Sequence, residues 1–162
     1  VGATVIGTVS TPDKAALATD AGADHVLFYK SEDVAARVRD ITGGAGVRVT
    51  FDGIGMSTWE TSLAATGRRG MIVSYGNAGG PVSDVNLGVL AQKGSLFVTR
   101  PTLFDYYADP VERQAGADYV FDMFRQGVIS ANIGQTSALE DVAQAHRDLE
   151  AGKTVGATVL RP

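Results

Sequence analysis

The stretch VRVTFDGIG at residues 47–55 predicts a short buried strand that ends in a turn with two glycines. Its apolar residues are β-branched or aromatic, which is typical of strands. Similar apolar runs predict further strands at residues 4–9, 25–29, 71–75, 95–99 and 157–160. The segments between them predict helices at residues 12–21, 31–42, 57–67, 109–127 and 137–152. Short, uniformly apolar strands that alternate with helices indicate a parallel sheet with helices on both faces.

The predicted fold class is therefore α/β, a doubly wound and mostly parallel sheet. The alternation weakens after about residue 100, and we expect the segment from about residue 130 onward to belong to a different sheet. Helix starts are predicted from local signals. Thr11 and Ser31 are expected N-caps, and residues 57–60 and 137–140 match the capping-box pattern.

Composition excludes several classes of function. The chain has 162 residues, with 14 Lys and Arg against 18 Asp and Glu, so its net charge of −4 argues against a nucleic-acid surface. The absence of cysteine excludes a disulfide framework and a thiolate–zinc site. No apolar run reaches the ~20 residues that cross a bilayer. We expect a cytoplasmic protein. Because the sequence lacks an initiator Met and opens on a strand, we also expect a piece of a longer chain.

Ligands of doubly wound sheets bind at the carboxyl ends of the strands. The expected strand tips carry small residues or glycine, which allow a ligand to approach the backbone and to lie across several tips. The phosphate-binding pattern G-x-G-x-x-G is absent after a strand. The glycines at residues 43–46 lie at the other end of the sheet and predict a plain turn, and Gly53 with Gly55 is only a weak signal.

The first strand tip, residues 8–11, carries hydroxyl residues and no carboxylate, and Lys14 follows one helical turn later. An NAD site usually has an Asp or Glu here for the ribose 2′-hydroxyl, so a cation favours a 2′-phosphate instead. A solvated helix position is the alternative interpretation of Lys14. Asp52 is interpreted as a strand end with an Asx-type turn rather than as a base. His146 is expected to pack on the apolar face of its helix.

Seven segments occur in an order that resembles one family. They are residues 7–14, 28–29, 41–44, 51–55, 74–77, 93–101 and 145–150. Together they resemble the zinc-independent quinone oxidoreductases of the medium-chain dehydrogenase/reductase superfamily, over essentially the whole chain. The resemblance implies that residues 1–129 form a Rossmann NADP-binding domain that lacks its first Gly-rich strand and helix. Residues 130–162 would return to a catalytic domain that is absent here. The absent strand would lie between the first and third strands of this chain.

The resemblance also implies a cofactor site for NADPH and no catalytic side chain or metal ligand in this chain. Ser10, Lys14 and Tyr29 would surround the 2′-phosphate, and Gly53 and Ile54 would line the adenine and ribose. The nicotinamide side would be formed by Tyr75, Gly76, Asn77, Phe97, Val98 and Arg100. The strand at residues 95–99 would pair with its copy in a homodimer.

The activity implied by the resemblance is hydride transfer from NADPH to a small-molecule quinone or enone, with this chain inactive on its own. An enoyl or other double-bond reductase of the same superfamily is the alternative. A non-catalytic dimerisation or nucleotide-binding module is the alternative from another class.

Overall fold

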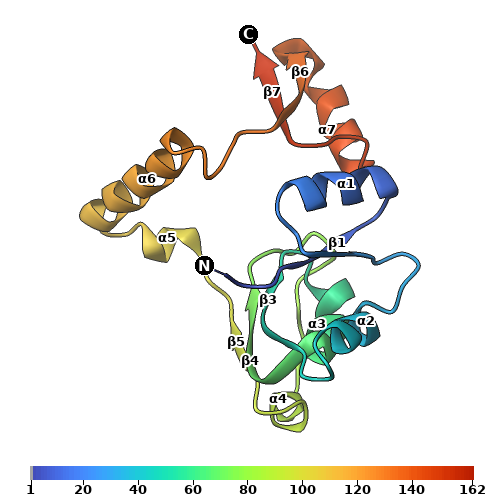
Figure 1. Cartoon of the computed structure of the whole chain (residues 1–162). Coiled ribbons are helices and arrows are strands. Elements are labelled where there is room, and N and C mark those ends of the chain that lie inside the picture. The colour runs from blue at the N-terminus through green and yellow to red at the C-terminus, as the bar shows by residue number, and fades with distance from the viewer. Residues whose placement is uncertain (1) are drawn as a thin grey trace. The chain divides into compact units, whose positions relative to one another are not determined.

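The computed structural model describes residues 2–162 and divides the chain into two compact units, residues 1–105 and 106–162. The strands are β1 (Ile6–Val9), β2 (His25–Phe28), β3 (Val47–Asp52), β4 (Thr66–Ser74), β5 (Phe97–Thr99), β6 (Ile133–Ala138) and β7 (Ala157–Arg161). The α-helices are α1 (Pro12–Asp20), α2 (Val34–Ile41), α3 (Trp59–Ala65), α4 (Gly88–Gln92), α5 (Leu103–Tyr106), α6 (Pro110–Arg125) and α7 (Val142–Glu150). Every predicted strand and helix has a counterpart, and α4, α5 and β6 are additional (Figure 1).

All strand pairs are parallel, which confirms the predicted α/β class. In the first unit, β1 pairs with β2, and β4 lies between β3 and β5. β1 and β3 belong to different hydrogen-bonded sheets, at the position where the resemblance puts the absent strand. The boundary between the compact units falls between Asp105 and Tyr106 along the chain. The predicted domain boundary at residues 129 and 130 stays a prediction.

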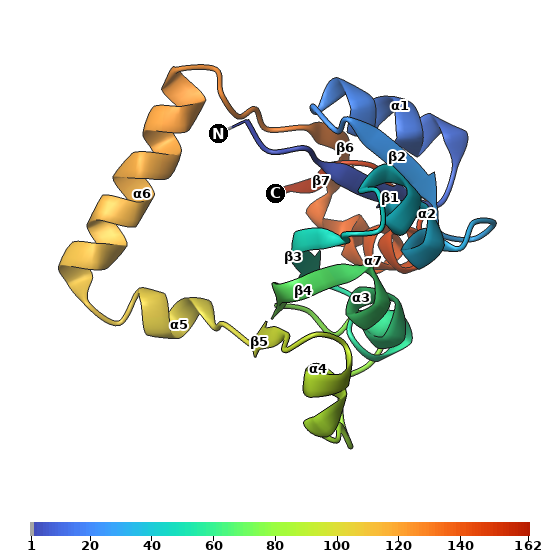
Figure 2. The same ribbon diagram turned by 60° about the horizontal axis from the view of Figure 1, so that its bottom comes forward.

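Two apolar clusters hold the first unit together. One joins Leu27, Val38 and Ala65, with Ile6 and Val47 packed against it. This cluster therefore links β1 and β2 to β3 through α2, although no hydrogen bonds join the two sheets. The second cluster contains Trp59, Leu63, Ile72 and Leu96, and it packs α3 on β4. Figure 2 shows β3 and β4 next to each other with α3 on one side of them.

The other face of β3, β4 and β5 carries exposed apolar side chains. Phe51 is 73% exposed and Phe97 is 58% exposed, and Val49 and Met71 share this face. The prediction of helices on both faces therefore holds for β1, which has α1 on one side and α2 and α3 on the other (Figure 1). For β3, β4 and β5, residues 2–105 put α3 on one face, and a helix on the other face stays a prediction.

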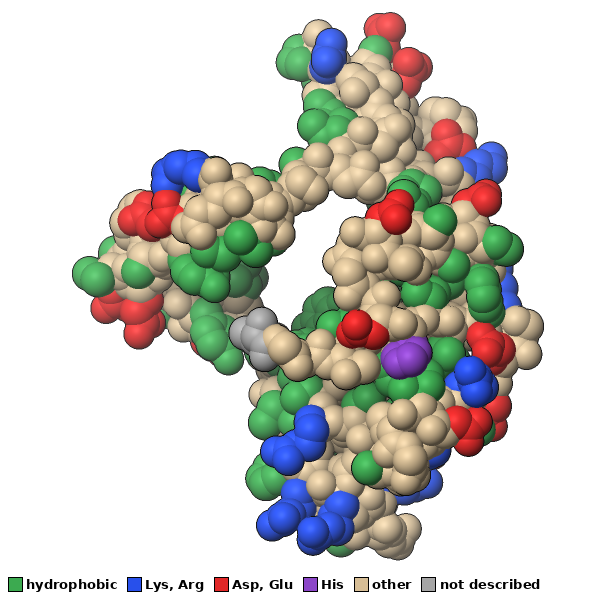
Figure 3. All heavy atoms as spheres, in the orientation of Figure 1, with side chains coloured by type: hydrophobic (Ala, Val, Ile, Leu, Met, Phe, Trp, Pro, Cys, Tyr) green, Lys and Arg blue, Asp and Glu red, His purple; other side chains and the backbone are tan. Residues whose placement is uncertain are grey.

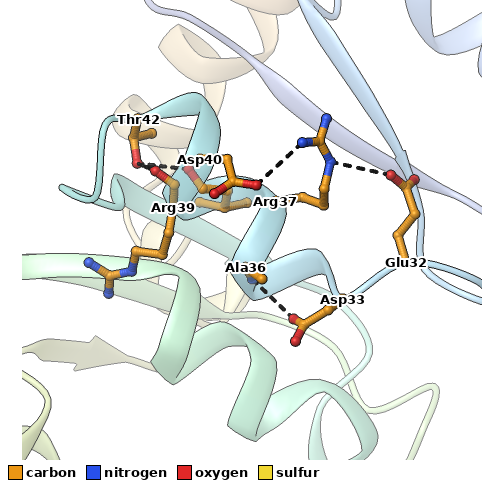
Figure 4. A network of polar contacts seen from close by, with 8 residues as sticks. Glu32, Asp33, Ala36, Arg37, Arg39, Asp40 and Thr42 are labelled. Atoms are coloured by element: carbon orange, nitrogen blue, oxygen red, sulfur yellow. Dashed lines mark hydrogen bonds and ion pairs between the residues drawn. The ribbon is translucent and has the colours of Figure 1, made fainter.

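α2 begins at a different cap from the predicted one. The Asp33 side chain accepts from the Ala36 N–H at 3.0 Å, so Asp33 and not Ser31 is the N-cap. Figure 4 shows Arg37 between Glu32 and Asp40, with ion-pair distances of 3.4 Å to each. Arg39 is not part of this ion-pair network, and its guanidinium donates to the Ala64 carbonyl at 2.7 and 3.0 Å. Arg39 thus ties α2 to the end of α3.

Both predicted capping boxes are wrong, because each falls on a different local structure. Residues 56–58 form a 3₁₀ turn, and the Thr58 hydroxyl donates to Asp52 rather than capping α3. Ser137 pairs with Leu160 inside β6, and a second 3₁₀ turn precedes α7. Thr11 does occupy the N-cap of α1, but its side chain makes no capping hydrogen bond.

The second unit begins at Tyr106, the last residue of α5, and contains α6, β6, α7 and β7. β6 and β7 form their own parallel sheet, as predicted for the segment after residue 130. The Asp109 side chain caps α6 by accepting from the Val111 N–H at 2.7 Å. His146 is exposed, so its predicted packing is wrong. Among residues 2–162, no helix has the length and apolar character to cross a bilayer.

Charged side chains of one sign gather at one end of the first unit. Figure 3 shows Lys and Arg side chains where α4 lies. Arg48, Arg68 and Arg69 come from the starts of β3 and β4, and Lys93 follows α4 directly. These cations lie at the amino ends of the strands, opposite to the strand ends at which ligands bind.

Candidate functional site

Ser10, Lys14 and Tyr29 come from neighbouring segments at the carboxyl ends of β1 and β2. The Tyr29 N–H donates to the Val9 carbonyl at 3.2 Å, which sets the two strand tips side by side. Lys14 lies in the first turn of α1, which begins soon after β1. Tyr29 is 54% exposed, so its ring presents a large apolar surface next to the tip of β1. The tip combines a hydroxyl, a cation and an aromatic ring.

Asp52 organises the loop that follows β3. Its carboxylate is buried and accepts hydrogen bonds from two backbone N–H groups and two hydroxyls. The donors are Ile54 N and Gly55 N at 2.9 Å, Thr58 Oγ1 at 2.9 Å and Ser62 Oγ at 2.6 Å. The bond to Ile54 is the predicted Asx-type turn. Asp52 therefore shapes the loop that carries Gly53 and Ile54 and is not available as a base.

The pKa of Asp52 follows from this environment. Burial acts to raise the pKa of the carboxyl, but the hydrogen bonds from Ser62 and from the loop stabilise the ionised form more strongly. The pKa of Asp52 therefore lies below its usual value. The carboxylate stays charged at neutral pH and serves as a fixed acceptor.

Glycines at the tips of β3 and β4 pack against each other. A Cβ on Gly76 would overlap the Gly53 carbonyl oxygen, and a Cβ on Gly53 would lie 2.9 Å from the Tyr75 ring. Backbone bonds join the same loops: Tyr75 N–H donates to the Asp52 carbonyl at 2.9 Å, and Gly79 N–H donates to the Ile54 carbonyl at 2.7 Å. Gly76 is thus required because its backbone meets the Gly53 backbone, and Gly53 leaves room for the Tyr75 ring. The predicted reason, close approach of a ligand, is not needed to explain either glycine.

Arg100 holds the tip of β4 from the neighbouring strand. Its Nη1 donates to the Ser74 carbonyl at 2.8 Å and to the Gly76 carbonyl at 3.3 Å. Asn77 follows directly after Gly76 and lies at the rim of the same arrangement. The structure thus brings Tyr75, Gly76 and Arg100 together in one hydrogen-bonded arrangement at the ends of β4 and β5.

A cavity of about 330 Å³ opens beside this arrangement. Its polar lining comes from Ser74, Asn77 and Arg100, and its apolar lining comes from α3, from the loop before α4, from α4 and from β5. The apolar residues are Trp59, Pro81, Val82, Val85, Leu87, Leu90 and Val98. Of the predicted nicotinamide-side residues, Asn77, Val98 and Arg100 line this cavity, whereas Phe97 does not. Phe97 lies on the exposed face of β5.

A comparison with protein families matches residues 1–104 to the family described as zinc-binding dehydrogenase. The chain belongs to this family. The quinone oxidoreductase of Pseudomonas aeruginosa is 49% identical to the whole chain, which spans about half the length of that relative. The 2-haloacrylate reductase of a Burkholderia species is 41% identical over the whole chain and about half of its own length.

Solved structures of the family agree with the fold. A quinone oxidoreductase from Pseudomonas syringae has a TM-score of 0.95 and 48% identity, over 99% of this chain and 50% of its own. The Escherichia coli quinone oxidoreductase complexed with NADPH has a TM-score of 0.94 and 45% identity, with the same coverage. The predicted resemblance to quinone oxidoreductases is therefore confirmed along the whole chain.

The family description raises the question of zinc. Within residues 2–162, no group of three or more His, Asp or Glu side chains lies close enough together to hold a metal ion. The sequence contributes no cysteine ligand either. Residues 2–162 therefore do not by themselves supply a set of zinc ligands.

Sequence reasoning missed the buried hydroxyls that support the site. Thr58 and Ser62 fix Asp52, yet the sequence pattern assigns this segment only to a helix start. The available signal is their spacing, six and ten residues after an Asp that ends a strand. That spacing puts two hydroxyls on the turn and helix that follow the strand, within reach of the carboxylate.

Proposed function

We propose that this chain is the cofactor-binding part of an NADPH-dependent oxidoreductase that reduces a quinone or enone. One observation carries the proposal: the Escherichia coli quinone oxidoreductase complexed with NADPH shares 45% of its residues with this chain at a TM-score of 0.94. Because the chain spans half of such relatives, the activity of a whole protein is part of the proposal. The predicted cytoplasmic location also stays part of it.

The chemistry of the strand tips fits NADPH. Ser10 and Lys14 supply a hydroxyl and a cation for the 2′-phosphate, and the exposed rings of Tyr29 and Tyr75 offer stacking surfaces. Ile54 presents an apolar surface for adenine from the loop held by Asp52. Asn77, Val98 and Arg100 would lie along the nicotinamide side. When bound, the cofactor supplies a hydride from its nicotinamide ring.

The residues of this chain orient the reactants and exclude water and do no acid–base chemistry. Asp52 is committed to its loop, and Nη1 of Arg100 donates to two carbonyls. A quinone is a good hydride acceptor and needs no strong general acid, which suits a site without a convincing acid–base pair. The protein's role is then positioning and electrostatics, as in other cofactor enzymes.

Activity is tested in a fusion that joins the N-terminal half of the Pseudomonas aeruginosa relative to this chain. We expect the fusion to oxidise NADPH with 1,4-benzoquinone, and we expect the 162-residue chain alone to be inactive. A folded fusion that binds NADPH but reduces no quinone would contradict the proposal. The 41% identity to a 2-haloacrylate reductase favours an activated alkene as the second candidate substrate, so 2-chloroacrylate is assayed in parallel.

Lys14→Ala is expected to weaken NADPH binding roughly 10- to 150-fold and to leave NADH binding nearly unchanged. The reason is that a charge-assisted contact to phosphate contributes ~1.5–3 kcal/mol. Isothermal titration of both cofactors into the fusion measures the two affinities. Lys93→Ala, at the opposite end of the strands, is the matched control and should alter neither affinity. Equal losses for both cofactors in Lys14→Ala would show that Lys14 does not bind the 2′-phosphate.

We further propose that the chain forms a homodimer through β5, extending the predicted strand 95–99. β5 is an edge strand with Phe97 exposed, and pairing with a second copy would cover an edge that otherwise invites aggregation. Phe97→Lys is expected to raise the dimer dissociation constant at least about tenfold, measured by analytical ultracentrifugation. Val111→Lys, an exposed apolar position on α6, is the control. A monomeric parent chain would refute this arrangement.

A further inference from the structure

The cavity beside the tips of β4 and β5 has a strongly uneven lining. Three of its lining residues, Ser74, Asn77 and Arg100, are polar, and the others, among them Trp59, Val85 and Leu90, are apolar. Small-molecule sites commonly combine an apolar pocket with a few polar groups that set orientation. The polar end coincides with the residues that we propose for the nicotinamide side. The apolar part therefore begins next to the position of the reacting ring.

The apolar majority of the cavity lining favours an uncharged occupant. Arg100 is the one charged residue among its lining, and its Nη1 donates to the Ser74 and Gly76 carbonyls at 2.8 and 3.3 Å. These two bonds engage Nη1 in holding the tip of β4. The remaining lining of the interior offers no ionic group. An uncharged apolar group is the occupant that such a surface stabilises.

We propose that this cavity binds an alkyl or prenyl substituent of the quinone, so that the substrate class is quinones with an apolar side chain. The inference rests on the proposed function, because it places the quinone ring at the nicotinamide side and its substituent against Trp59, Val85 and Leu90. The volume of about 330 Å³ corresponds to roughly ten water volumes and accommodates a chain of several carbons. Each methylene removed from water should strengthen binding up to roughly fourfold.

The chain contains a built-in reporter for this binding. Trp59 is its only tryptophan, and it lines the cavity. Quinones quench indole emission, and the absence of cysteine removes thiol addition as a side reaction. The 162-residue chain is titrated with 2-alkyl-1,4-benzoquinones from methyl to hexyl, and Trp59 emission is recorded. We expect the dissociation constant to fall at least about tenfold across the series.

Two variants and a control test the location. Val85→Phe fills the cavity, and Leu87→Asp puts a charge at an exposed lining position where folding is not at risk. In both variants we expect the dissociation constant to change by about twofold or less between the methyl and the hexyl quinone. Val128→Phe, at an exposed position in the second unit, should show the same fall in the dissociation constant across the series as the parent chain. Circular dichroism checks that each variant is folded.

The outcomes separate this inference from the proposed function. Equal affinities across the alkyl series, or a dependence that survives in both Val85→Phe and Leu87→Asp, would overturn the cavity assignment. Failure of the proposed function is read independently, from the fusion with NADPH and unsubstituted 1,4-benzoquinone. That quinone has no side chain, so its reduction does not depend on the apolar cavity.

Discussion

Asp52→Ala is expected to lower the free energy of unfolding by about 3–4 kcal/mol. The substitution leaves the Ser62 hydroxyl and the Gly55 N–H without the acceptor that they have in the native structure. A hydrogen bond to a charged group contributes ~1.5–3 kcal/mol, and an unsatisfied buried donor costs ~1–3 kcal/mol. Urea unfolding followed by Trp59 emission measures the change, because Trp59 lies in the same unit.

The expected loss is graded across matched variants. Ser62→Ala removes a single bond to Asp52 and should cost about 1–2 kcal/mol. Asp52→Asn keeps an acceptor oxygen for the loop and should be milder than Asp52→Ala. A loss below about 1 kcal/mol for Asp52→Ala would mean that the loop keeps its shape without the carboxylate.

The free energy of unfolding should fall as the pH is lowered into the acid range. Because the pKa of Asp52 is lowered in the folded state, its stabilisation is fully present above the unfolded value of about 3.9 and is lost as the pH falls through the folded pKa. Asp52→Asn removes the titrating group. The parent chain should therefore lose more stability than Asp52→Asn between about pH 5 and the acid limit, and parallel curves for the two would contradict this account.

Gly76→Ala is the second substitution with a large expected effect, about 3 kcal/mol or more of stability. The new Cβ would overlap the Gly53 carbonyl oxygen and lie 2.6 Å from the Gly53 carbonyl carbon. Both are backbone atoms, so no side chain can turn aside. The loops must separate, which breaks the bonds from Tyr75 N–H to Asp52 and from Gly79 N–H to Ile54.

Gly7→Ala is the control for this substitution. Gly7 lies in β1, and a Cβ there would be 3.7 Å from the Ala23 Cβ, which is ordinary van der Waals contact. We expect a change of about 1 kcal/mol or less in its free energy of unfolding. In the fusion, Gly76→Ala should also weaken NADPH binding, while Gly7→Ala should not. Similar unfolding midpoints for the two variants would show that the contact between the loops tolerates a methyl group.

Much of the candidate site was predictable because it depends on local order along the chain. Tyr29, Ile54 and Tyr75 follow apolar runs, and parallel strands bring their carboxyl ends to one edge. The roles of Gly53, Gly76 and Arg100 were not predictable in the same way. Gly53 lies against the Tyr75 ring, whereas Gly76 and Arg100 meet backbone atoms of other segments. Nothing in a single sequence states which of these groups touch. The cap predictions for Ser31 and residues 57–60 were wrong for a related reason. A capping pattern is so short that it also occurs in segments that adopt another local structure.

The sequence by itself determined the order and type of most elements, the parallel pairing and the residues at most strand ends. These follow from apolar runs, turn residues and the rule that strand–helix–strand units give parallel strands. Only the tertiary structure decided that Asp52 accepts hydrogen bonds from its own loop, that Gly76 packs directly on the Gly53 backbone, and that Arg100 binds the tip of β4 beside an apolar cavity. Those features depend on contacts between residues distant in the chain, whose energies appear only when the strands are side by side.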